Sequence, residues 1–276
     1  IRLDNDADFS GIKCLKLNGI NSCIFKDKLN YVHIINVDDR TDSSYNTSQY
    51  NETRQTVPAV GDIDNDDSLD AVFWFNEDNR GGYGFLVFDL NSRSLNTNFN
   101  KSGIVDDIFS PAFGSPQSFI LKGQPVLADL DNDNKLEIAA SVFYLNCVYE
   151  GCDWYTELFV YSYNGSKLFS KCGMNPSRNC NDGSNSNEQW EGTNPFVIDA
   201  NNDLIDNICF IKDKKINFYP VNMTINCYNY SGDLVLDSSV FPYTLTVQTA
   251  TVADMDNDGK KDIITENHVY AQNGTS

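Results

Sequence analysis

The chain has 276 residues, of which 41% are hydrophobic and 12% aromatic, a composition typical of a folded globular protein and not of a disordered one. Its formal net charge is -19, with 39 acidic against 20 basic side chains, which argues against binding to nucleic acid or to anionic membranes. No apolar run approaches the roughly 18 residues that a membrane-spanning helix needs.

The N-terminal segment is acidic and then strand-like. Asp4, Asp6 and Asp8 precede a run over residues 12–17, and an Asn18-Gly19 turn follows. These acids are in register with a motif that recurs along the chain. We therefore assign residues 1–57 to a degenerate first blade or to closing strands.

The rest of the chain, residues 58–276, contains a repeated motif at irregular spacing. A β-branched and aromatic run follows each copy, and a second strand-like run comes after it. The motif begins at Asp62, Asp129, Asp199 and Asp254; the first runs are residues 71–75, 138–144, 208–211 and 263–265; the second begin at Phe85, Leu158, Ile216 and His268. No segment shows sustained helical periodicity with caps. We predict an all-β fold, a β-propeller of about four to five blades of antiparallel strands, as an excerpt of a larger propeller.

Each motif has the composition of a metal-binding loop. In the most regular copy, which runs from Asp254 to Asp262, acids occupy the first, third, fifth and ninth positions. Hard carboxylate oxygens at this density favour Ca²⁺ over softer metals. The sixth position needs a left-handed backbone, which Gly259, Asp67 and Asn134 tolerate best in the three complete copies.

Two other interpretations of the acids, a turn without a cation and an EF-hand, fit the sequence less well. An acidic turn without a cation would leave four carboxylates repelling one another within nine residues. An EF-hand needs a bidentate Glu at its twelfth position, where this chain has Phe73, Ala140 or Thr265. The third loop has lost a charge and is expected to be a weak metal site, formed by Asp199, Asn201, Asp203 and Asp206.

The motif, Pro-x-x-x-Asp-x-Asp-x-Asp-x-x-x-Asp/Glu before an aliphatic strand, resembles the FG-GAP/VCBS repeats of integrin-α-type β-propellers. The resemblance covers about residues 58–276 and implies that each loop joins the first two strands of a blade. It also implies three sets of Ca²⁺ ligands: Asp62, Asp64, Asp66 and Asp70; Asp129, Asp131, Asp133 and Glu137; and Asp254, Asp256, Asp258 and Asp262, completed by the carbonyls of Ser68, Lys135 and Lys260. The Phe-Gly and Gly-Ala-Pro elements that name the family are mostly absent.

The eight cysteines fall in close couples. Zinc is disfavoured because there is no Cys-x-x-Cys and the histidines are only His33 and His268. We expect disulfides between neighbours, namely Cys14–Cys23, Cys147–Cys152, Cys172–Cys180 and Cys209–Cys227, and therefore an oxidising, extracellular or cell-surface location. Glycosylation sequons occur at Asn46, Asn51, Asn100, Asn164, Asn222, Asn229 and Asn273, about as many as chance gives.

No catalytic constellation is visible, so the sequence predicts that the chain is not an enzyme. The long polar segment from Cys172 to Asn194 carries Trp190, which would suit a sugar ring or a protein partner unless it folds back onto its own blade. Trp74 and Trp154 are expected in the core. The favoured interpretation is a non-enzymatic adhesion or scaffold module of a cell-surface or appendage protein, with an extracellular protein or glycan as partner. The alternative is a carbohydrate-binding propeller, possibly attached to an enzyme outside this chain.

The ends of the sequence carry a further expectation. The first residue is Ile1, no signal peptide precedes it, and the last copy stops after its second strand, so we expect a processed product or an excerpt. The ring is then completed by other chain segments. In the alternative, residues 12–37 pair with residues 262–272 and close it.

Overall fold

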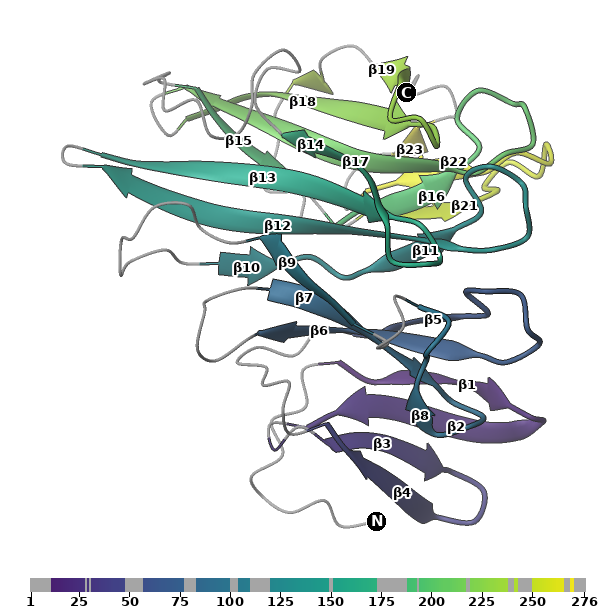
Figure 1. Ribbon diagram of the computed structural model, residues 1–276. Coiled ribbons are helices and arrows are strands. Elements are labelled where there is room, and N and C mark those ends of the chain that lie inside the picture. The colour runs from purple at the N-terminus through teal and green to yellow at the C-terminus, as the bar shows by residue number, and fades with distance from the viewer. Residues whose placement is uncertain are drawn as a thin grey trace. The chain divides into compact units, whose positions relative to one another are not determined.

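The computed structural model describes residues 11–27, 29, 31–47, 57–76, 83–99, 104–109, 120–148, 151–172, 188–192, 194–216, 219–237, 241–242, 250–265 and 269–270. All regular structure in these ranges is β-strand, and every strand pair given for them is antiparallel, which confirms the all-β fold class (Figure 1). The described residues include no helix long and apolar enough to cross a membrane.

Sheet A has the strand order β1-β2-β3-β4. Its strands are β1 (Lys13–Leu17), β2 (Ile20–Lys26), β3 (Tyr31–Asn36) and β4 (Thr41–Asn46). The β1–β2 hairpin turns at Asn18 and Gly19, with φ of 50° and 82°, as the Asn-Gly pair predicts. These strands pair with one another, so the degenerate first copy forms a sheet of its own.

Sheet B has the order β5-β6-β7-β8, with β9 also paired to β7. Its strands are β5 (Ala59–Gly61), β6 (Asp70–Asn76), β7 (Tyr83–Asp89), β8 (Ser94–Leu95) and β9 (Ile104–Phe109). Sheets A and B share one hydrophobic core, in which Ile24 and Val32 pack with Phe73, Leu86 and Phe88. Trp74 is fully buried, which confirms its assignment to the core.

Sheets C, D and E follow in chain order. Sheet C contains β10 (Ile120–Lys122), β11 (Val126–Ala128), β12 (Glu137–Val148), β13 (Gly151–Tyr161) and β14 (Lys167–Cys172). Sheet D contains β15 (Glu188–Gly192), β16 (Phe196–Ile198), β17 (Asn207–Ile216), β18 (Tyr219–Tyr228), β19 (Leu234–Asp237) and β20 (Phe241–Pro242). Sheet E contains β21 (Thr251–Ala253), β22 (Asp262–Ile264) and β23 (Val269–Tyr270).

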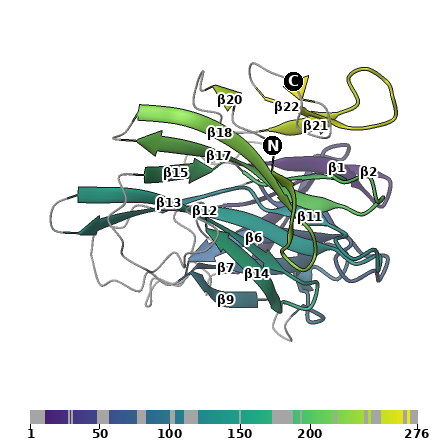
Figure 2. The ribbon, with the colours of Figure 1, turned by 90° about the horizontal axis from the view of Figure 1, so that it is seen from above.

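Long hairpins dominate sheets C and D (Figure 2). The apolar faces of these two sheets pack together through Val160, Phe210 and Tyr228, among others. Ile198 and Ile211 of sheet D pack in turn against Ile263 of sheet E. In sheets B, C and D a three-residue strand therefore pairs with a longer strand that follows it, which agrees with a repeated unit.

The chain divides into two compact units. Sheets A and B belong to the first unit, and sheets C, D and E belong to the second. Among the described residues, β22 pairs with β21 and β23, and no strand of sheet A pairs with it. The five sheets are open in the part of the chain that the structure describes, so the expected propeller remains a proposal.

Three boundaries differ from those that the sequence predicted. The predicted second strand from Ile216 is wrong, because β17 extends to Ile216 and β18 begins only at Tyr219. The first long strand of sheet C reaches Val148 instead of Tyr144. The segment before Asn194 was expected to be a loop, yet β15 pairs Trp190 with Lys214 of β17. Backbone pairing to a long neighbouring strand formed a strand where the sequence, rich in Glu and Gln, gave little β signal.

Candidate metal-binding loops

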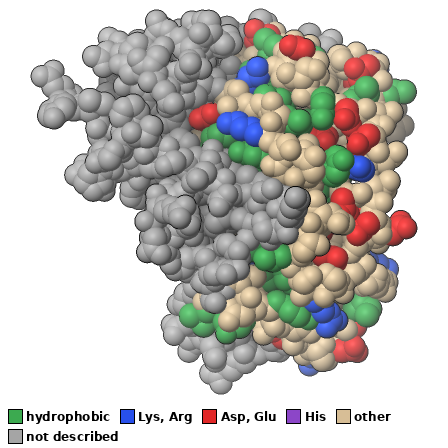
Figure 3. Space-filling view, in the orientation of Figure 1, with side chains coloured by type: hydrophobic (Ala, Val, Ile, Leu, Met, Phe, Trp, Pro, Cys, Tyr) green, Lys and Arg blue, Asp and Glu red, His purple; other side chains and the backbone are tan. Residues whose placement is uncertain are grey.

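The four acidic motifs lie at equivalent places in sheets B to E. Each loop joins a three-residue strand to the next strand in the chain, with which it pairs: β5 to β6, β11 to β12, β16 to β17, and β21 to β22. We call them the first, second, third and fourth loop, and we number their positions from Asp62, Asp129, Asp199 and Asp254. Acidic side chains are exposed on the side of each unit where these loops lie (Figure 3).

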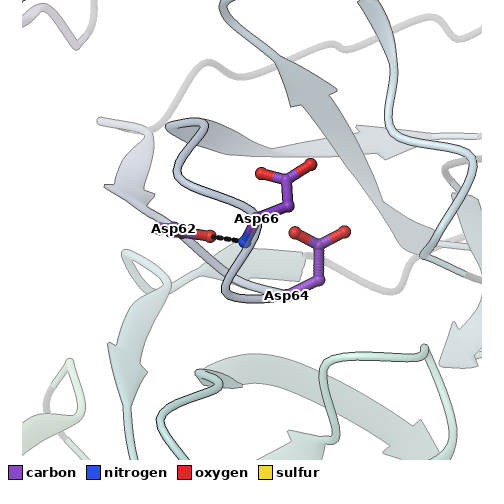
Figure 4. A group of neighbouring side chains, drawn as sticks. All are labelled: Asp62, Asp64 and Asp66. Carbon is purple, nitrogen blue, oxygen red and sulfur yellow. Dashed lines mark hydrogen bonds between the residues drawn. The ribbon is translucent and has the colours of Figure 1, made fainter.

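The first Asp of each loop fixes the shape of the turn. In the first loop, the Asp62 carboxylate accepts a hydrogen bond from the amide of Asp66 at 3.0 Å (Figure 4) and another from the amide of Asp67 at 2.9 Å. The same pair of bonds, from the fifth and sixth residues, is made by the first Asp of the second, third and fourth loops. A carboxylate at the first position is thus needed for the fold of the loop as well as for any ion.

The backbone is left-handed at two positions in every loop. At the sixth position φ is 65° for Asp67, 65° for Asn134 and 87° for Gly259, as expected from the sequence. The fourth position is also left-handed, and here the sequence has Asn in all four loops, at Asn65, Asn132, Asn202 and Asn257. This recurring Asn was a signal that the sequence analysis missed, since Asn is among the non-Gly residues that best tolerate this conformation.

The third loop places Leu204 at the sixth position, with a φ of 68° and 90% of its surface exposed. A left-handed conformation costs a residue with a Cβ about 1–2 kcal/mol. We expect Leu204→Gly to raise the free energy of unfolding by about 1 kcal/mol in chemical denaturation, because no packing is lost. Leu234→Gly is the matched control: Leu234 is 46% exposed in β19, and there glycine should destabilise the protein. A lower stability of Leu204→Gly would contradict the prediction.

Three of the four loops bring carboxylates together. The oxygens of Asp62, Asp64 and Asp66 lie within 4.8 Å of one another, and so do those of two further sets: Asp129, Asp131 and Glu137, and Asp254, Asp256 and Asp262. These clusters could hold a metal ion. Asp70, Asp133 and Asp258 were also expected as ligands but lie outside the three clusters.

The fifth-position carboxylates have another role in the structure. Asp66, Asp133 and Asp258 each accept a hydrogen bond from the amide two residues later, at 2.8 to 2.9 Å. The donors are the amides of Ser68, Lys135 and Lys260, whose carbonyls were the expected backbone ligands. These bonds turn the chain at the seventh position toward the second strand.

The first cluster fits a cation by an independent criterion. The Oδ1 atom of Asp64 is buried and has no hydrogen-bond partner among the residues that the structure describes. A buried carboxylate oxygen without a donor is costly unless a positive charge lies beside it. Burial raises the pKa of Asp66, and the neighbouring Asp64 and Asp62 add to the rise.

The ninth-position acids are strongly perturbed in the first two loops. Burial raises the pKa of Asp70 from 3.8 to about 7, and burial raises the pKa of Glu137 from 4.5 to about 7. Asp131 also has a raised pKa, mainly through burial and then through the charge of Asp133. Carboxyl groups in such an environment prefer either a proton or a metal ion as counter-charge.

The third loop is built differently, and the expected role of Asp206 is not the one that the structure gives it. The ninth position is held by Asn207, whose side-chain oxygen accepts the amide of Ala200 at 2.8 Å. Asp206 instead accepts a backbone hydrogen bond from Asp129 of the second loop, in the electrostatic field of Lys261. Counting nine positions from Asp199 would have identified Asn207.

The third loop also satisfies its acids internally. The side-chain amide of Asn201 donates to Asp203 at 2.8 Å, so a hydrogen-bond donor stabilises this carboxylate where a cation could otherwise do so. Only Asp199 and Asp203 remain as carboxylates at the equivalent positions.

The first loop has polar partners from outside the motif that the sequence analysis missed. Asn96 donates to Asp70 at 2.8 Å, and Asn98 donates to Asp64 at 2.6 Å. Ser68 donates its hydroxyl to Asp89 at the end of β7. These residues lie 21 to 34 positions from their partners, so no local pattern could reveal them.

Two of the expected disulfides are formed. Cys14–Cys23 joins β1 to β2, and Cys209–Cys227 joins β17 to β18. The backbone register also places Cys147 opposite Cys152, but their side chains and residue 180 lie outside the described residues. Disulfides of this kind persist in oxidising compartments.

The other candidate residues are only partly placed. Asn46 and Asn164 are exposed and Asn229 is half-buried, while Asn51, Asn100 and Asn273 lie outside the described residues. For Asn222, Trp154 and Trp190 only the backbone is described, and Asp4, Asp6, Asp8 and His268 are outside the described ranges. The ring of His33 lies between two carboxylates: its Nε2 atom is 3.1 Å from Asp27 Oδ2, and its Nδ1 atom is 3.0 Å from Asp42 Oδ2.

The comparisons with known proteins give a distant likeness. No family model matches the sequence, and no curated protein matches it. Among solved structures, the rhamnogalacturonan lyase YesW matches with a TM-score of 0.45 and 12% identity, over 96% of this chain and 59% of that one. The exotype rhamnogalacturonan lyase YesX matches with a TM-score of 0.47 and 15% identity, over 95% of this chain and 49% of that one.

These matches correct one expectation. The sequence predicted that the chain is not an enzyme, and the likeness to these two enzymes contradicts that prediction. The chain spans about half to three fifths of the length of these lyases. At this identity and TM-score the likeness assigns no substrate or reaction to the chain.

Proposed function

We propose that the chain is a calcium-stabilised β-propeller module that presents a rigid binding or scaffold surface outside the cell. The buried, unpartnered Oδ1 of Asp64 within a cluster of three carboxylates is the observation that carries the calcium assignment. Oxygen-only ligands without Cys or His favour a hard cation such as Ca²⁺. The recurring position of the loops, between a three-residue strand and the next strand that pairs with it, supports the resemblance to FG-GAP/VCBS repeats.

Calcium would act on the fold where each loop leaves its short strand. The strands β5, β11 and β21 have three residues each. In the second and fourth loops, an ion held by acids on both sides of the turn would fasten the short strand to the next strand, with which it pairs. It would also neutralise the repulsion among the clustered carboxylates.

The extracellular location and the partner are also part of the proposal. The disulfides Cys14–Cys23 and Cys209–Cys227 support a secreted or cell-surface location, and we propose an extracellular protein or glycan as the partner.

Calcium titration calorimetry on the full chain tests the metal assignment. We expect binding at the first, second and fourth loops. Asp64→Asn, Asp131→Asn and Asp256→Asn should each weaken one site, because each keeps the side-chain shape and removes one ligand charge. Asp233→Asn, an exposed acid far from the loops in sequence, is the control of equal charge change. Absence of calcium binding, or equal titrations for all four variants, would refute the assignment.

A carbohydrate-binding role is a second candidate, supported by a pocket in the second unit. The pocket measures about 500 Å³ and lies along β11, β16 and β21. Gln124 and Asn194 line it together with Asp206, Thr251 and Lys261, beside apolar side chains such as Phe196. Such a mixture of planar polar and apolar groups suits a sugar. A glycan array on the full chain, repeated with Lys261→Ala, tests this role: loss of a bound glycan in the variant would support it, and no bound glycan would count against it.

A further inference from the structure

The first loop differs from the second in having a clamp that comes from the outer edge of its own sheet. The clamp is the turn of residues 96–99, which directly follows β8. Asn96 donates to Asp70 at 2.8 Å, and Asn98 donates to Asp64 at 2.6 Å. In the described residues, no side-chain amide from outside the second loop is seen to donate to Asp131 or Glu137.

Asn96 is rigidly held, so it can act as a fixed point for the loop. Its side chain is buried, with 6% of its surface exposed. Its side-chain oxygen accepts the amides of Asn98 at 2.8 Å and Phe99 at 3.2 Å. The backbone amide of Asn96 donates to the carbonyl of Val87 in β7, and the neighbouring Phe99 is fully buried. The donor to Asp70 is therefore positioned by the core of sheet B.

Asn98 orients the carboxylate of Asp64. Its side-chain amide donates to the Oδ2 atom, while the Oδ1 atom of the same carboxylate is buried and has no hydrogen-bond partner among the described residues. Asp64 therefore offers one oxygen to the protein and keeps the other for the cluster with Asp62 and Asp66.

Asn96 explains why the ninth-position acid is absent from the first cluster but present in the second and fourth. Both oxygens of Asp70 are engaged, Oδ1 by Asn96 and Oδ2 by the amide of Ile63 at 3.2 Å. In the second and fourth loops the ninth-position acids, Glu137 and Asp262, are members of the cluster. The clamp thus turns the ninth-position acid of the first loop into a support for the site.

We infer that the turn of residues 96–99 is the second half of the first metal site, and that calcium bound at Asp62, Asp64 and Asp66 orders this outer turn through Asn98. The inference rests on the proposed calcium binding. Asn96 and Asn98 are positioning residues: Asn98 binds the ligand Asp64, Asn96 binds the supporting acid Asp70, and neither binds the ion. Groups that orient metal ligands change metal affinity about 10- to 100-fold when they are lost.

Hydrogen exchange followed by mass spectrometry, with the full chain in calcium and in chelator, tests the coupling. We expect calcium to slow exchange at the loop amides of residues 66–68 and also at the amides of Asn98 and Phe99. In Asn98→Ala, calcium should still protect residues 66–68 at saturation but should protect the turn less. Thr97→Ala is the matched control, since Thr97 is an exposed neighbour in the same turn.

An affinity measurement provides the second readout. In a chain carrying Asp131→Asn and Asp256→Asn, which weaken the other two sites, Asn98→Ala should lower the calcium affinity about 10-fold, and Thr97→Ala should leave it unchanged. If calcium protects the loops but not the turn, and Asn98→Ala titrates like Thr97→Ala, the coupling is refuted while the calcium module stands. If calcium protects none of the three loops, the proposed function and the coupling both fail.

Discussion

Chelation of calcium is expected to lower the stability of the protein more than any single substitution discussed above. An ion that binds only the folded chain stabilises it by about 2.7 kcal/mol per site when its free concentration is 100 times the dissociation constant. The described residues form three carboxylate clusters, so the effect should accumulate over the sites that are filled. Thermal unfolding of the full chain in excess calcium and in excess chelator, with the disulfides intact, measures it.

The loop variants make this experiment specific. Asp131→Asn and Asp256→Asn should each reduce the difference between the two melting temperatures, because each weakens one site. Asp233→Asn should leave the difference unchanged. Magnesium should replace calcium poorly, since Mg²⁺ demands a stricter octahedral geometry and releases its water reluctantly. A melting temperature that does not respond to the chelator would contradict the calcium assignment.

The second large effect concerns the pH dependence of the free energy of unfolding, which should reverse its sign when calcium is removed. In the metal-free protein, burial raises the pKa of Asp70 and of Glu137 to about 7, above their usual values of 3.8 and 4.5. Between these usual values and pH 7 the folded chain therefore binds more protons than the unfolded chain, so stability falls as the pH rises. One pKa unit corresponds to about 1.4 kcal/mol, so the two raised pKa values together lower the free energy of unfolding by several kcal/mol as the pH rises through this range.

Calcium should invert this slope. Bound calcium requires ionised carboxylates and competes with protons, so its affinity, and the stability that it adds, should rise from pH 5 to pH 7. Chemical denaturation at several pH values, with calcium and with chelator, gives both slopes. In chelator, Asp70→Asn and Glu137→Gln should flatten the dependence, because neither amide titrates in this range. Parallel slopes under the two conditions would contradict the prediction.

Local sequence patterns determined much of this protein. Alternating apolar runs and the absence of capped helical periodicity determine strands, because the side-chain period of two is a local property. The left-handed sixth position was predictable from Gly259, Asp67 and Asn134, since only a few residue types tolerate it. The pairs Cys14–Cys23 and Cys209–Cys227 followed from proximity along the chain, because both couples bridge adjacent antiparallel strands.

Tertiary structure decided what surrounds the loops. Asn96 and Asn98 reach Asp70 and Asp64 only because β7 and β8 fold back alongside β6, a contact between positions 26 and 34 residues apart. The role of Asp206 likewise depends on the second loop of a neighbouring sheet. A residue's spacing within a motif limits which ligands can converge, but the polar groups that hold those ligands come from long-range packing, which the local pattern does not encode.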